Sequence, residues 1–60
     1  MATRYQRHMS PFNPEVIENI FDTETKAFIP VDERNPDYRR VLQYCIDLQI
    51  TIYDLDLFQG

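Results

Sequence analysis

Apolar residues recur at helical spacing between positions 36 and 48. Five of these side chains fall within about 120° of arc on a helix that turns 100° per residue. They are Tyr38, Val41, Leu42, Cys45 and Leu48. Ahead of them, Asn35 can cap a helix, Pro36 suits its first position, and Asp37 complements the helix dipole. The pattern predicts one amphipathic helix over about residues 36–48, with these eight residues as its structural determinants.

Residues 50–60 change to a period of two, which is typical of an extended strand. Ile50 and Ile52 fall on one face of such a strand, whereas Tyr53 and Leu55 fall on the other. Apolar groups on both faces indicate a strand that is covered from two sides. Because one short helix cannot cover both faces, we expect residues 50–60 to be a docking strand that neighbouring molecules cover.

Residues 14–29 fit two different structures. Asn13 and Pro14 could begin a short helix over residues 14–21. Four apolar side chains would share one face of it: Val16, Ile17, Ile20 and Phe21. The stretch is also rich in β-branched and aromatic residues, and a polar turn at 22–26 follows it. Strand, turn and strand is therefore the second interpretation, and local signals do not choose between the two.

The first 13 residues have no apolar period, and Ser10 and Asn13 each precede a proline. A residue before proline is biased toward extended geometry, so we expect an extended arm over 1–13 in which Tyr5, Met9 and Phe12 are anchors. Together the segments predict a single small α+β domain over residues 1–60. It consists of the arm, a hairpin and helix within 14–49, and the docking strand 50–60. We expect it not to be a self-sufficient globule.

The composition excludes several classes of protein. Of the 60 residues, 43% are hydrophobic and 13% aromatic, which is too apolar for a disordered acidic tail. No apolar run approaches the roughly 18 residues of a membrane span, and the first 30 residues lack the apolar stretch of a signal peptide. The single cysteine leaves no intrachain disulfide. We therefore expect a soluble protein, made inside the cell, with no membrane partner.

The formal net charge of −4 is unevenly distributed. Residues 1–12 contain Arg4 and Arg7 and no acidic residue, whereas residues 13–60 contain all ten acidic residues and four basic ones. Two arginines provide few phosphate contacts, and the acidic remainder repels nucleic acid. The charge pattern favours docking on a protein over binding to nucleic acid.

No residues have the arrangement of a catalytic site. His8 is the only histidine and has no acid or nucleophile near it in sequence, so we expect an exposed loop histidine. Cys45 lies on the apolar helix stripe, which predicts a small buried hydrophobe and not a nucleophile. The only glycine is the last residue, so no phosphate-binding loop is present. We predict no catalytic residue, no cofactor and no small-molecule substrate.

Two groups of acidic residues suggest metal binding only superficially. Asp32, Asn35 and Asp37 have part of the spacing of a calcium loop, but its glycine and distal glutamate are missing. Asp54 and Asp56 would lie on one side of a strand, where we expect them to face solvent or a partner. We predict that the chain holds no metal ion.

Residues 28–44, FIPVDERNPDYRRVLQY, resemble a short segment found in small tail, tail-fibre and uncharacterised proteins of tailed bacteriophages. That segment has the pattern I-P-x-D-x-x-N-x-D-Y-x-x-x-L-x-W. The residues that match are Ile29, Pro30, Asp32, Asn35, Asp37, Tyr38 and Leu42. Tyr44 replaces the usual tryptophan, and Cys45 continues the helix where a Gly-Asn stop is usual. The resemblance covers about a quarter of the chain, and it favours a β-hairpin over about residues 16–29.

The resemblance implies a minor structural protein of a tailed-phage virion. Such a protein would dock on larger capsid, neck or tail subunits, or on a second copy of itself, through its extended termini. The expected contacts are the apolar side chains of the termini, namely Tyr5, Phe12, Ile50, Ile52, Tyr53, Leu55, Leu57 and Phe58. The alternatives are a non-virion phage protein that inhibits a host enzyme and a small assembly chaperone.

Overall fold

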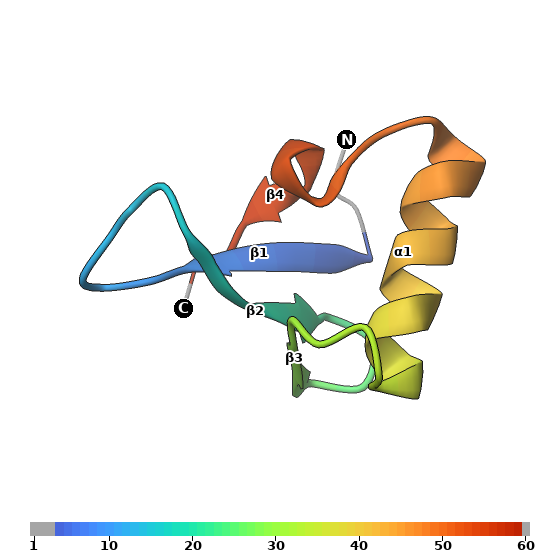
Figure 1. The fold of residues 1–60 in the computed structure, drawn as a ribbon, viewed down its shortest axis with the longest axis horizontal. Helices are drawn as coiled ribbons and strands as arrows, with labels where there is room; N and C mark the ends of the chain where they lie inside the picture. Colours follow the sequence, from blue (N-terminus) through green and yellow to red (C-terminus); the bar gives the residue numbers. More distant parts are fainter. Residues whose placement is uncertain (1–3, 60) are drawn as a thin grey trace.

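Four short strands form one mixed sheet in the computed structural model, which describes residues 4–59 (Figure 1). In chain order the strands are β1 (Tyr5–Met9), β2 (Ile17–Asp22), β3 (Ala27–Pro30) and β4 (Asp56–Leu57). Their order across the sheet is β3-β2-β1-β4. β2 pairs antiparallel with both β1 and β3, whereas β1 and β4 run parallel. The N-terminal segment therefore supplies an inner strand, and the C-terminal segment supplies an edge.

The predicted helix is confirmed as α1 (Pro36–Leu48). The Asn35 side-chain oxygen accepts hydrogen bonds from the backbone amides of Asp37, at 2.8 Å, and Tyr38, at 3.3 Å. These bonds satisfy two of the amides that a helix start leaves without partners. At the other end Gln49 is left-handed, and the Ile50 amide donates to the Cys45 carbonyl at 2.9 Å. This pair of caps explains why the helix has these bounds.

The hairpin interpretation of residues 16–29 is confirmed, with β2 and β3 as its arms. Ile20 lies opposite Ile29, and Phe21 lies opposite Phe28. Asp22 organises the turn, because its side-chain oxygen accepts hydrogen bonds from the amides of Glu24 and Thr25 at 2.9 and 3.4 Å. The side chain of a turn aspartate thus supplies the partners that the backbone lacks there.

A bulge in β2 explains why the apolar spacing of this stretch also fits a helix. His8 pairs with Asn19 and Met9 pairs with Ile17, so Glu18 is an extra residue that breaks the alternation of β2. Ile17 and Ile20, three residues apart, are consequently both buried. Without the bulge, side chains three positions apart would point to opposite faces of the sheet.

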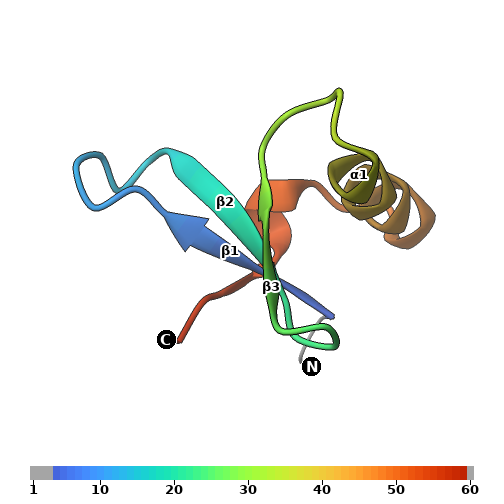
Figure 2. The same ribbon diagram turned by 90° about the horizontal axis from the view of Figure 1, so that it is seen from below.

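The core lies between the sheet and α1, which packs on one side of the strands (Figure 2). Its buried hydrophobic residues come from every part of the described chain: Tyr5, Ile17, Ile20, Ile29, Tyr38, Val41, Cys45 and Leu55. The radius of gyration is 10.6 Å, close to the value of about 10 Å for a compact chain of this length.

The predicted layout of the two termini needs correction. The part of the arm that the structure describes contains β1 and is built into the sheet, and residues 1–3 lie outside the described residues. Residues 50–60 are not one extended strand, because a 3-10 helix, η1 (Ile52–Asp54), precedes the two residues of β4. Thr51 and Asp54 form a capping box, with the Thr51 amide donating to Asp54 Oδ2 at 2.8 Å. The Thr51 hydroxyl and the Asp54 carboxylate thereby stabilise a helical turn in a segment whose apolar residues alternate as in a strand.

The expectation that both termini need cover from neighbours is also wrong for two key residues. Tyr5 is 4% exposed and Leu55 is 1% exposed, and both belong to the core of the chain itself. The inner strand β1 brings Tyr5 beneath the helix, and the turn at η1 directs Leu55 inward. Within residues 4–59, both terminal segments therefore contribute a side chain to the core of the chain.

Candidate protein-interaction site

Aromatic side chains gather on the face of the sheet that α1 does not cover. Phe21 lies between two buried residues of β2, Ile20 and Asp22, and so points to the opposite face. Phe28 is the cross-strand partner of Phe21 and shares that face. His8 of β1 and Phe58, the residue after β4, complete the cluster. We name these four residues the aromatic face: His8, Phe21, Phe28 and Phe58.

The four rings of the aromatic face contact one another directly. Phe21 has its ring centroid 5.0 Å from those of both Phe28 and Phe58, and the last two are 5.4 Å apart. His8 lies 5.7 Å from Phe28 and 5.2 Å from Phe58. These tilted and edge-on arrangements are favourable for aromatic pairs. Phe28 is nevertheless 51% exposed, so the cluster presents apolar surface outward.

His8 is half-buried within this cluster and is not the exposed loop histidine that the sequence predicted. It belongs to β1, and its Nδ1 lies 2.9 Å from Asn19 Oδ1. The Glu18 carboxylate lies 4.0 Å from the same nitrogen. The bulge in β2 places these two polar neighbours beside the ring. They fix its orientation and put an acidic group at the border of the aromatic face.

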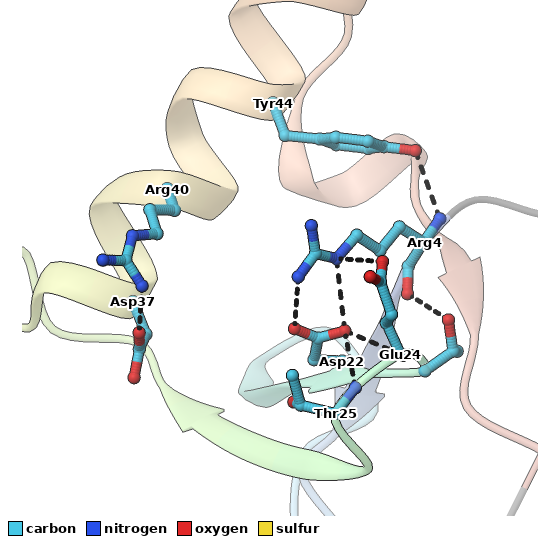
Figure 3. Close-up of polar contacts among 8 residues, drawn as sticks. Arg4, Asp22, Glu24, Thr25, Asp37, Arg40 and Tyr44 are labelled. Atoms are coloured by element: carbon cyan, nitrogen blue, oxygen red, sulfur yellow. Dashed lines mark hydrogen bonds and ion pairs between the residues drawn. The ribbon is translucent and has the colours of Figure 1, made fainter.

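A second group of polar residues lies on the helix side of the sheet (Figure 3). Arg4 donates through Nε and Nη2 to the two carboxylate oxygens of Asp22, at 3.3 and 3.2 Å. Arg4 Nε also lies 3.3 Å from Glu24 Oε2, and the Arg4 amide donates to the Tyr44 hydroxyl at 3.2 Å. Nearby, Arg40 pairs with Asp37 at 3.1 Å on α1. Charged side chains of both signs thus line a cleft of about 320 Å³.

The chemistry of this cleft is that of a structural ion-pair network. Burial alone would raise the pKa of Asp22, but hydrogen bonds from Arg4 and from the amides of Glu24 and Thr25 outweigh it and lower that pKa below its ordinary value. Asp22 is therefore held as a carboxylate, and Arg4 as its counter-ion. Within residues 4–59, no buried side-chain nitrogen or oxygen lacks a hydrogen-bond partner. Such a network joins the start of β1 to the hairpin turn.

The predicted contact residues are divided between the core and the surface. Tyr5 and Leu55 are buried, as described above. Phe12 is almost fully exposed in the loop between β1 and β2, and Leu57 is half-exposed at β4. Only Phe58 joins the aromatic face.

Three predicted contacts, Ile50, Ile52 and Tyr53, lie together beside α1. With Leu42 and Ile46 they line a shallow apolar groove of about 380 Å³ between α1 and η1. Ile50 and Ile52 are partly buried against the core, whereas Tyr53 is exposed. This groove is a second uncovered apolar area, separate from the aromatic face.

The predicted structural residues of the helix occupy their expected side, with one exception. Tyr38, Val41 and Cys45 are buried and Leu42 packs partly against the core, but Leu48 is half-exposed. Burial raises the pKa of the Cys45 thiol, with a smaller contribution from Asp54 in the same direction. A thiol held protonated in this way is a poor nucleophile.

The acidic residues that were considered for metal binding serve local structure. The Asp32 side chain accepts a hydrogen bond from the Arg34 amide at 3.0 Å, as expected for a turn residue. Asp54 caps η1 and Asp56 lies in β4, so the two do not lie on one strand as predicted. In the described part of the chain, no three His, Cys, Asp or Glu side chains are grouped as metal ligands.

Sequence reasoning did not identify His8, Phe21 and Phe28 as surface residues that act together. The signal for the two phenylalanines was present in the hairpin itself, because pairing of residues 22 and 27 across the turn places Phe21 opposite Phe28. No local signal could have added His8 and Phe58, since they come from opposite ends of the chain.

Comparisons with protein families, with curated proteins and with solved structures found no match to this chain. Among residues 4–59, no helix combines the length and the apolar character needed to cross a membrane.

Proposed function

We propose that this chain is a non-catalytic protein-binding module that docks on a larger protein through its aromatic face. The single observation that supports this proposal is the packing of three phenylalanine rings and His8 on the side of the sheet that α1 leaves uncovered. Contiguous exposed apolar surface on a small protein typically marks an interaction site. Aromatic residues are also enriched among the residues that dominate binding energy.

The state of the reactive groups supports the non-catalytic part of the proposal. The Cys45 thiol is buried, with a raised pKa, and Asp22 is fully engaged with Arg4 and the turn amides. His8 is oriented by Asn19 and surrounded by phenylalanine rings. A general base needs a partner whose proton it can take, and these contacts provide none.

We further propose that the larger protein is a capsid, neck or tail subunit of a tailed phage and that the chain is located in the virion. Support for this setting comes from the segment at residues 28–44 and its resemblance to small phage tail proteins. In this setting the protein would be a minor structural component that joins or covers larger subunits.

The location can be tested by mass spectrometry of purified phage particles. Detection of this chain at a fixed ratio to a major subunit is the expected result. Absence from particles would exclude the virion role and favour the inhibitor or the assembly chaperone instead.

The docking face can be tested with a photo-crosslinking amino acid at position 28. Phe28 is 51% exposed, so replacement there should preserve the fold. A matched variant carries the same group at Ile46, which is 66% exposed on α1. We expect position 28 to crosslink to a particle subunit and position 46 not to do so. Crosslinking from position 46 alone would show that the aromatic face is not the docking surface.

A further inference from the structure

We infer that the loop between β1 and β2 inserts Phe12 into the apolar groove between α1 and η1 of a second copy of this chain. The contact is separate from the aromatic face, so it goes beyond the docking on a larger protein that is proposed above. The inference rests on two apolar features of one molecule, a projecting ring and a groove, that the chain itself leaves uncovered.

Phe12 is the most exposed large hydrophobic residue in the described part of the chain, at 96%. It lies in the loop between β1 and β2, which projects from the sheet at the end opposite α1 (Figure 1 and Figure 2). Because α1 forms one wall of the groove, the loop cannot reach the groove of its own chain. Cover for Phe12 therefore has to come from another molecule.

Hydrogen bonds hold this loop in one shape. The Ser10 hydroxyl oxygen accepts from the amides of Phe12 and Asn13, at 3.2 and 3.4 Å. The Ser10 amide donates to the Val16 carbonyl at 2.8 Å and so closes the loop. Two prolines within the loop fix further backbone angles. A loop organised in advance loses little conformational entropy when a partner buries its apolar tip, so this loop is suited to present Phe12.

The groove between α1 and η1 has the size and the chemistry to accept a phenyl ring. Its volume is about 380 Å³. An apolar cavity of about 150 Å³ is enough to hold benzene. The residues that line it are mostly apolar: Leu42, Cys45, Ile46, Ile50, Thr51, Ile52 and Tyr53. Insertion of the Phe12 ring would remove apolar surface of both copies from water.

The charge pattern favours a second copy at these two places. Copies with a net charge of −4 repel one another over most of their surface. Residues 9–14, however, contain no Asp, Glu, Lys, Arg or His, and neither do the residues that line the groove. No charge is therefore buried without a partner when the two meet.

The two features also occur in equal number, because each copy has one loop and one groove. A second copy covers a groove with the residue that itself lacks cover. A different protein would need both a pocket for Phe12 and a separate apolar group for the groove. A second copy is accordingly the occupant that accounts for both features at once.

The contact is expected to be weak in solution, because one loop buries a small area. Stable interfaces bury at least about 1,200 Å² in total, far more than a single loop tip provides. Its measurement therefore needs about 1 mM protein, an effective concentration that copies tethered side by side also reach.

Sedimentation equilibrium of the purified chain, up to about 1 mM, tests the inference with two variants. Phe12→Ser removes the ring, and Ile46→Glu places a charge in the groove. Both side chains are exposed, so the fold should be retained, which circular dichroism checks. We expect each variant alone to associate at least about tenfold more weakly than the wild type.

A mixture of the two variants provides the sharpest readout. The Phe12→Ser variant keeps its groove and the Ile46→Glu variant keeps its loop, so mixing should restore association between unlike copies. Phe28→Ser is the matched control, because it makes the same substitution at an exposed phenylalanine of the aromatic face. This control should associate as the wild type does.

Several results would overturn the inference. They are a wild-type chain that stays monomeric up to about 1 mM, undiminished association of Phe12→Ser, and a mixture that does not regain association. Equal losses in Phe12→Ser and Phe28→Ser would show that copies associate through the aromatic face instead.

A photo-crosslinking amino acid at position 12 identifies the occupant directly. We expect it to crosslink to groove residues of a second copy, such as Ile46 and Tyr53. A crosslink in phage particles to a larger subunit, and none to a second copy, would overturn the inference. The proposed function is tested separately from position 28, so either can fail alone. A copy in the groove also keeps larger subunits away from position 46, which therefore remains a valid control.

Discussion

Arg4 and Asp22 form a bidentate ion pair where the N-terminal strand meets the hairpin turn, with nitrogen–oxygen distances of 3.3 and 3.2 Å. Asp22 is 4% exposed, whereas the side chain of Arg4 is 42% exposed. The same carboxylate accepts hydrogen bonds from the amides of Glu24 and Thr25. One buried side chain thus connects β1, β2 and the turn that leads to β3.

Replacement of this carboxylate should destabilise the protein. We expect Asp22→Asn to lower the free energy of unfolding by about 1–2 kcal/mol, because it removes a charge-assisted pair but keeps an oxygen for the turn amides. Half-exposed Arg4 can regain water, which keeps the loss below that of a fully buried pair. Urea unfolding followed by circular dichroism measures the change.

The matched control is Glu24→Gln. Glu24 is an exposed partner of Arg4, so its replacement should lower the free energy of unfolding by less than about 0.5 kcal/mol. Equal losses in the two variants would contradict the assigned role of Asp22.

The same carboxylate should make stability depend on pH in the acid range. The pKa of Asp22 is lowered in the folded protein, so on acidification the unfolded state takes up the proton first. The stabilisation is therefore complete above the ordinary aspartate pKa of about 4 and is lost as the pH falls below it. We expect the difference in unfolding free energy between wild type and Asp22→Asn to be constant near neutral pH and to shrink below about pH 4. A difference that stays unchanged down to about pH 2 would contradict this prediction.

The helix could be predicted from sequence because its determinants are local. Asn35, Pro36 and Asp37 define the start within three consecutive residues, and the apolar stripe defines the buried side. Its bounds in the structure agree with the prediction. Only Leu48 departs from the pattern, because the last turn extends beyond the cover of the core.

The termini could not be predicted correctly, because their environment depends on pairing between distant residues. β1 pairs with β2 and with β4, whose residues lie 50 positions beyond their partners in the sequence. A period of two at residues 50–57 also concealed the turn of η1, which Thr51 and Asp54 stabilise together. The apolar character of the termini was recognised, but the sequence alone did not show that Tyr5 and Leu55 cover the core of their own chain.

The aromatic face was missed for a related reason. His8, Phe21, Phe28 and Phe58 come from four segments that only the complete sheet brings together. In addition, the bulge at Glu18 makes the apolar spacing of β2 resemble that of a helix. A hairpin prediction that paired residues 22 and 27 across the turn would have identified the Phe21–Phe28 pair. It would still have missed His8 and Phe58.

Two neighbouring leucines near the C-terminus should respond very differently to truncation. Leu55 is 1% exposed, so Leu55→Ala should create a cavity and cost about 3 kcal/mol of stability. Leu57 is 48% exposed, and Leu57→Ala should cost less than about 1 kcal/mol. Urea unfolding of both variants in the absence of any partner measures the difference. If Leu55→Ala were neutral in the isolated protein, the C-terminal segment would not belong to its core.

The left-handed residue after α1 should be a site of stabilisation. Gln49 has φ of 59°, and its amide and that of Ile50 donate back to the last turn of the helix. Glycine adopts this conformation without the steric cost of a Cβ atom, so Gln49→Gly should raise the free energy of unfolding by about 0.5–1 kcal/mol. Gln43→Gly is the matched control, because the same substitution inside the helix should lower it by about 1 kcal/mol. Opposite shifts of the thermal midpoint are therefore expected. A loss of stability in both variants would show that the cap contributes less than the backbone entropy that glycine adds to the unfolded chain.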